Sequence, residues 1–199
     1  MRTKEIKIGT YKEWKAVNET VTQRILEKHS DINVDFEGWY EDIIENFCEN
    51  VEKIGFNVTI DDVQFSGFWS QGDGASFTGS IDILKYLKET KQLTAYRPLV
   101  KAINEGNVEN IVGITRGSCL YSHENTCSVD TIEVYGYISP KVEDLRIDLE
   151  YELEEKRKDL SIELYRDLKK TYNYLCSEEI IVETLVANEY EFDESGDIA

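Results

Sequence analysis

A stripe of leucines runs through the last third of the chain and has to be buried by whatever fold the chain adopts. Its apolar members recur at helical spacing: Leu145, Leu149, Leu153, Leu160, Leu164, Leu168, Tyr172 and Leu175. This period predicts a long amphipathic helix, capped by Ser139 and begun by Pro140. The charged middle of the stripe leaves open whether the helix is continuous or breaks near Asp159. The cover is either the chain's own N-terminal helices or a second copy, so a homo-oligomer stays possible.

The rest of the chain alternates between helical and strand periods. Apolar spacing predicts helices over 11–29, 36–54, 81–90, 99–104 and 178–188. Segments rich in β-branched and aromatic residues predict strands over 57–60, 63–68, 111–122 and 127–138. The last two strands flank the turn 123–126 and are expected to form a hairpin. The acidic residues 189–199 are expected to form a frayed tail.

These elements predict an α+β fold with a small, mostly antiparallel sheet, N-terminal helices and a long helical C-terminal region. We expect a single domain over residues 1–199. It would comprise an α+β core at 1–138, the helical region at 139–188 and the tail at 189–199. The best candidate for an internal boundary is Ser139, where the helical region begins.

The charge balance limits the partners of the chain. Its 40 Asp and Glu outnumber its 22 Lys and Arg, which gives a net charge of −18. Such a surface repels phosphate backbones and favours basic partners, so no nucleic acid is expected. No apolar run is long enough for a membrane span, and the first residues do not resemble an export signal. Four cysteines without C-x-x-C spacing suggest reduced thiols, so we expect a cytoplasmic protein without a cofactor or a metal site.

A Gly-rich segment at 69–80 is the first candidate site. It follows a strand, precedes a helix, and carries aromatic, amide, carboxylate and hydroxyl groups among its glycines. Backbone at glycines can approach a ligand closely, so this composition suits a small planar ligand or a partner side chain. The segment lacks the spacing of either phosphate-binding glycine motif. The alternative is structural: its aromatics anchor the loop, while Gln71 and Asp73 satisfy backbone amides.

The hairpin turn is the second candidate site, because it holds His123, one of two histidines in the chain. Asp73 and His123 would form an acid–base pair if the hairpin lies beside the loop, with Ser76, Ser118 or Ser122 as nucleophile. The alternative, which we favour, is an exposed histidine at a hairpin tip. Metal binding by Cys119, His123 and Cys127 is weakly indicated, because their spacing suits a helix better than a hairpin.

The string FSGFWSQGDGASF, within Val63–Phe77, resembles the signature of a family of small, mostly uncharacterised proteins of bacteriophages and prophages. The pattern of 14–56 and the pair Tyr121 and His123 are also similar, so the resemblance covers about residues 11–137. It implies a phage or mobile-element origin, and some members carry a loose antitoxin label.

Together these features predict an acidic, phage-encoded binding protein that blocks or sequesters a host protein, in an anti-defence or antitoxin-like role. A small-ligand site in the loop is a variant of this hypothesis. A small hydrolase or nucleotide-processing enzyme using Asp73 and His123 is the alternative. The predicted partner- or ligand-binding residues are Trp69, Gln71, Asp73, Gly74, Ser76, Phe77, Arg116, Tyr121 and His123.

Overall fold

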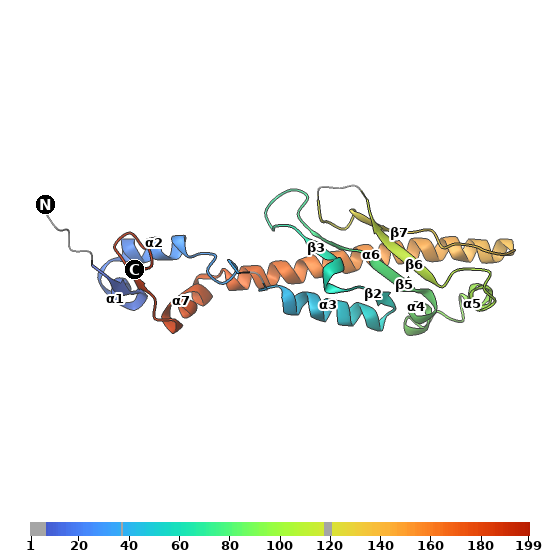
Figure 1. Cartoon of the computed structure of the whole chain (residues 1–199), viewed down its shortest axis with the longest axis horizontal. Coiled ribbons are helices and arrows are strands. Elements are labelled where there is room, and N and C mark those ends of the chain that lie inside the picture. Colours follow the sequence, from blue (N-terminus) through green and yellow to red (C-terminus); the bar gives the residue numbers. More distant parts are fainter. Residues whose placement is uncertain (1–6, 37, 118–120) are drawn as a thin grey trace. The chain divides into compact units, whose positions relative to one another are not determined.

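The computed structural model describes residues 7–36, 38–117 and 121–199. Its antiparallel sheets, N-terminal helices and long C-terminal helix confirm the predicted α+β class. The chain forms two compact units. Figure 1 labels their helices and strands. The sheet unit is Glu41–Leu168, and the terminal unit joins the part before Glu41 to Lys169–Ala199. The units therefore do not divide at Ser139, and the single domain over residues 1–199 stays a prediction.

The sheet unit is built on a four-stranded antiparallel sheet in the order β2-β5-β6-β7. These strands are β2 (Phe56–Asn57), β5 (Gly79–Asp82), β6 (Ile111–Arg116) and β7 (Cys127–Val129). A second antiparallel pair, β3 (Val63–Phe65) and β4 (Ala75–Phe77), encloses the first half of the Gly-rich segment. The helices of this unit are α3 (Glu41–Lys53), η1 (Ile60–Asp62), α4 (Ile83–Glu89), α5 (Arg97–Asn104) and most of α6 (Pro140–Leu175).

The β6–β7 hairpin is confirmed, although both strands are shorter than predicted. Its register pairs Arg116 with Cys127 and Ile114 with Val129. Past β7, the backbone N–H of Ile132 donates to the side chain of Glu150 on α6, at 2.6 Å. The helix thus supplies the acceptor that a longer strand would have provided. The prediction of an unpaired loop throughout 69–80 was wrong, because residues 75–77 form β4 and β5 begins at Gly79.

Helix α6 continues through Asp159 without a break. Its charged middle stabilises the helix because the charges pair at helical spacing: Arg157 with Glu154, and Lys158 with Glu155. The leucine face is covered within the chain, since Leu149, Leu153, Leu164 and Leu168 are all buried.

The carboxylate of Glu152, on α6, connects the helix to α4 and to the segment that leads into α5. Glu152 accepts hydrogen bonds from the Tyr86 hydroxyl at 2.8 Å, the Gln92 amide at 2.6 Å and the Tyr96 hydroxyl at 3.1 Å. Burial, together with the charge of Glu152, raises the pKa of Tyr96 to about 12. Both tyrosines therefore remain neutral donors, and this end of α6 is fixed by hydrogen bonds rather than by an ion pair.

The terminal unit has its own small core. It contains α1 (Tyr11–Val17), α2 (Glu19–Lys28), α7 (Glu178–Ala187) and the pair β1 (Gly9–Thr10) with β8 (Glu191–Phe192). The single helix predicted over 11–29 divides at Asn18, whose side chain accepts from the backbone N–H groups of Thr20 and Val21. The helix predicted over 36–54 begins only at Glu41. The core is formed by Tyr11, Trp14, Val21, Ile25, Ile181, Leu185 and Phe192.

The acidic C-terminal segment is not a frayed tail, so that prediction was wrong. Phe192 is fully buried, and its carbonyl accepts from the indole N–H of Trp14 at 2.9 Å. Lys28 pairs with Asp197 at 2.7 Å, and His29 contacts the Gly196 carbonyl at 3.0 Å. One buried aromatic residue, Lys28 of α2 and the imidazole of His29 therefore hold a segment whose charge alone suggested disorder. Across the described ranges, every helix is too short or too polar to cross a membrane.

Candidate functional site

The loop 66–74, between β3 and β4, is held by its own residues. One carboxylate oxygen of Asp73 (Oδ2) accepts from the backbone N–H groups of Trp69 at 2.8 Å and Ser70 at 2.6 Å. Ser66 and Gly74 close its base, since the Ser66 N–H donates to the Gly74 carbonyl at 3.0 Å. Asp73 thus has the role that the structural alternative gave it: it satisfies backbone amides of its own loop.

Glycine lets this loop lie directly against the hairpin tip, residues 122–126. A Cβ on Gly74 would lie 2.6 Å from the Cα of His123 and 2.9 Å from the Ser122 carbonyl. Gly72 has a φ of +97°, and a Cβ there would lie 3.0 Å from the ring of Tyr121. The expected neighbourhood of loop and hairpin is therefore present, and it depends on close backbone approach at Gly74.

Backbone groups fix the conformation of the hairpin tip. The Asn125 N–H donates to Nδ1 of His123 at 3.1 Å, so Nδ1 is an acceptor and the proton of the neutral ring lies on Nε2. The His123 carbonyl accepts from the backbone N–H of Thr126 at 3.0 Å and from its hydroxyl at 2.7 Å. The tip is therefore an ordered turn that orients the imidazole.

Loop and tip border an open hollow of about 600 Å³. Its lining is mostly polar and comprises Gln71, Gly72, Asp73, Tyr121, His123, Glu124 and Asn125. The rings of Tyr121 and His123 stack with centroids 6.2 Å apart. Tyr121 is 54% exposed, and Trp69, in the same loop as Asp73, is 75% exposed. The hollow thus combines two carboxylates with an imidazole, a phenol and two amides, and the indole of Trp69 belongs to the same loop.

The other predicted site residues lie below this surface. Ser76 is fully buried on β4 and receives a hydrogen bond from the guanidinium of Arg116 at 2.8 Å. Phe77 is also fully buried, 5.3 Å from Phe47 between ring centroids. Ser76, Phe77 and Arg116 therefore support the site from within the fold. Ser118 and Cys119 lie outside the described residues.

The geometry favours binding over acid–base catalysis. Asp73 and His123 line the same hollow, but one side-chain atom of each already accepts a hydrogen bond from the backbone. Within the described ranges, no hydrogen bond joins their two side chains. Ser76 is too deeply buried to act as a nucleophile. The described residues also contain no cluster of three His, Cys, Asp or Glu side chains suited to a metal ion.

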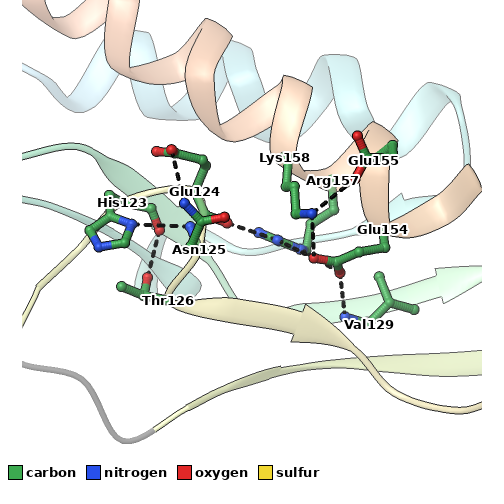
Figure 2. Close-up of polar contacts among 9 residues, drawn as sticks. All are labelled: His123, Glu124, Asn125, Thr126, Val129, Glu154, Glu155, Arg157 and Lys158. Carbon is green, nitrogen blue, oxygen red and sulfur yellow. Dashed lines mark hydrogen bonds and ion pairs between the residues drawn. The ribbon is translucent and has the colours of Figure 1, made fainter. Parts of the chain in front are cut away.

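Three contacts from α6 support the loop and the tip, and sequence reasoning missed all of them. The Arg157 guanidinium donates to the Glu124 carbonyl at 2.8 Å, and Glu154 accepts from the Val129 N–H at 2.9 Å, as Figure 2 shows. The Tyr165 hydroxyl donates to the Gly67 carbonyl at 3.2 Å. Burial raises the pKa of Tyr165, and the charge of Asp73 adds to this. Glu124 and Asn125 were also missed as lining residues, because they read as ordinary turn residues.

Residues 39–178 match the family model described as Domain of unknown function (DUF8835), which covers more than half of the chain. The chain belongs to this family. The DUF8835 match includes the whole sheet unit, and with it the hollow, the loop and the hairpin tip. No curated protein and no solved structure matches the chain. The family description names no activity, so the function has to be argued from the site.

Proposed function

We propose that the chain is a binding protein that receives basic side chains of a partner protein in the hollow between the loop 66–74 and the hairpin tip. The observation that carries the proposal is the composition of this hollow. Two carboxylates, Asp73 and Glu124, line a cavity of about 600 Å³ together with the partly exposed ring of Tyr121. This composition suits an arginine or lysine side chain.

A guanidinium is favoured by the carboxylates and by the aromatic ring of Tyr121 in the lining. Carboxylates accept its N–H groups in charge-assisted hydrogen bonds, and aromatic faces attract the cation. The net charge of −18 adds long-range attraction, which raises the association rate with a basic surface. Glu124 is the better-placed carboxylate, because Asp73 already accepts two backbone N–H groups.

The biological setting follows from the resemblance to phage proteins. In that setting the partner is a host protein in the cytoplasm, and the chain masks a basic surface of it, in an anti-defence or antitoxin-like role. A basic surface is also what a nucleic-acid-binding host protein would present, so the acidic chain would compete with nucleic acid for it. The chain itself would bind neither nucleic acid nor membrane.

A short cationic peptide tests the proposed chemistry directly. The probe is Gly-Arg-Arg-Arg-Gly with blocked ends, titrated by calorimetry at about 0.15 M salt, where exposed charges are screened beyond ~8 Å. Replacing Glu124 by Gln should weaken binding about fivefold, which corresponds to ~1 kcal/mol.

The matched control is Asp144→Asn, which removes one exposed carboxylate from α6 outside the hollow lining. It should leave the affinity within about twofold, as expected for a screened surface charge. Equal losses in both variants would show that the peptide senses only net charge, and the proposed site would be wrong. If the peptide binds as expected, a photo-crosslinking residue at position 121, introduced in expressing cells, should capture the natural partner.

A further inference from the structure

We propose that Arg157 is a positioning residue: from α6 it holds the hairpin tip in the conformation that forms one wall of the hollow. This inference rests on the proposed function for its purpose, but its geometry stands independently. Among the described residues, the one hydrogen bond from Arg157 to a residue that lines the hollow goes to the backbone carbonyl of Glu124, so we expect Arg157 to act on a ligand through the tip.

The first argument is the position of its contacts, which lie inside the turn and, through Glu154, in the strand after it. Nη2 of Arg157 donates to the Glu124 carbonyl at 2.8 Å, inside the tip. Nε and Nη2 also donate to the Glu154 carboxylate, at 3.1 and 2.7 Å. Glu154 in turn accepts from the N–H of Val129, in β7 after the tip, at 2.9 Å. One ion pair on α6 thus holds a residue inside the turn and a residue of the strand after it, as Figure 2 shows.

The second argument is energetic. The side chain of Arg157 is fully buried, and its Nη1 has no hydrogen-bond partner within the described residues. Removing a guanidinium from water is costly, and a buried ion pair often contributes no more to stability than apolar residues of similar size. A buried arginine is therefore poorly explained by stability, whereas a planar group with several fixed donors is well suited to hold a backbone carbonyl in place.

The third argument is that the segment held by Arg157 supplies three of the residues that line the hollow. His123, Glu124 and Asn125 all line the hollow, and their turn is closed by the bonds from Asn125 and Thr126 to His123. If the Glu124 carbonyl moved, the Glu124 side chain and the imidazole would move with it. A displacement of about 1 Å in such a site is enough to lower binding substantially.

Helix α6 offers a matched control. Arg146 pairs with Glu143 and Glu150, and it contacts the backbone carbonyl of Ile132 at 3.5 Å. It thus links α6 to the segment after β7, with the same chemistry as Arg157. Within the part of the chain that the structure describes, Arg146 makes no hydrogen bond or ion pair to a residue that lines the hollow. Arg146→Met and Arg157→Met each remove an ion pair on α6 and a hydrogen bond to a backbone carbonyl. Only Arg157→Met should affect the tip.

The experiment measures hydrogen exchange by NMR at individual amides, with thermal unfolding and titration of the same Gly-Arg-Arg-Arg-Gly peptide. In Arg157→Met, we expect the Asn125 and Thr126 amides to exchange at least tenfold faster, while Ile81 and Val112 in the central strands change less than twofold. Peptide binding should fall at least fivefold. Arg157→Lys should restore part of both, and it provides the test if the Met variant does not fold.

Arg146→Met should lower the melting temperature by a similar amount without changing exchange at the tip. Uniformly faster exchange in Arg157→Met, or equal effects of the two arginines at the tip, would show a purely structural role and overturn the inference. Unchanged exchange at Asn125 and Thr126 would overturn it as well. If the peptide does not bind the unaltered chain, the proposed function fails, while the exchange data still decide whether Arg157 positions the tip.

Discussion

The two walls of the hollow are stabilised in different ways. The loop 66–74 is closed from within, because Asp73 accepts backbone N–H groups three and four residues earlier in the chain. The hairpin tip instead depends on Arg157, which lies 33 residues further along the chain on α6. The loop is held by local hydrogen bonds, so we expect it to keep its shape whenever it folds. The tip should keep its shape only while α6 is docked. Loss of the Arg157 contact should therefore reach the site through the tip, while the loop keeps its own bonds and its contact with Tyr165 of α6.

The contact between the two walls should be the most sensitive point. A Cβ at Gly74 would lie 2.6 Å from the Cα of His123, and backbone cannot yield as a flexible side chain can. We expect Gly74→Ala to cost about 2–3 kcal/mol in the free energy of unfolding, as overpacking does. It should also abolish peptide binding, because loop and tip are forced apart. Urea denaturation and calorimetry measure both effects.

Gly117→Ala is the control for this prediction, since Gly117 belongs to the same hairpin. Among the described residues, a Cβ there would meet only the Thr126 carbonyl, at an ordinary 3.7 Å. This variant should stay within about 0.5 kcal/mol of the unaltered chain. A Gly74→Ala variant that behaves like Gly117→Ala would mean that the two walls are not in contact in solution.

The contrast between the walls also explains what the sequence could predict. The Gly-rich loop and the hairpin were recognisable because their signals are local: glycines, turn residues and alternating apolar residues. Arg157 and Glu154 looked like solvated charges in the middle of a helix, and only the docking of α6 beside β7 shows what they hold. Phe192 was missed for the same reason: its partner Trp14 is 178 residues away. Residue spacing cannot reveal a contact between distant segments. In both cases the charge of the surrounding sequence also suggested exposure to solvent.

Replacing Asp73 tests whether the loop is self-contained. Asp73→Ala leaves the N–H groups of Trp69 and Ser70 without their acceptor, but both are exposed and water can replace it. We therefore expect a modest cost of about 1 kcal/mol. Hydrogen exchange should accelerate at residues 69 and 70 and stay unchanged at Asn125 and Thr126. Asp73→Asn, which keeps one acceptor oxygen, should recover part of the loss. Faster exchange at the tip would show that the walls are coupled and contradict the contrast.

Acidic pH should weaken the ion pair between Glu154 and Arg157 that holds the tip. Of the predicted changes, this one should have the smallest effect on the free energy of unfolding. Burial raises the pKa of Glu154, but the hydrogen bonds from Arg157 and the Val129 N–H, with the charges of Arg157 and Lys158, outweigh burial and lower it overall. A carboxyl whose pKa is lower in the folded than in the unfolded chain stabilises the fold above its unfolded pKa, about 4.3 for Glu. That contribution disappears as pH falls through the folded pKa.

Glu154→Gln isolates this contribution, because glutamine keeps an acceptor for the Val129 N–H but carries no charge at any pH. Other carboxyls whose pKa is lowered, such as Asp62 and Glu143, remain in both proteins, so their effects cancel in the comparison. The urea midpoint of the variant should lie below that of the unaltered chain at pH 7, and this gap should shrink by half or more at pH 3. An equal gap at both pH values would mean that the charge of Glu154 does not stabilise the fold. The tip would then be held by the neutral hydrogen bonds alone, and its dependence on α6 would be one of shape rather than charge.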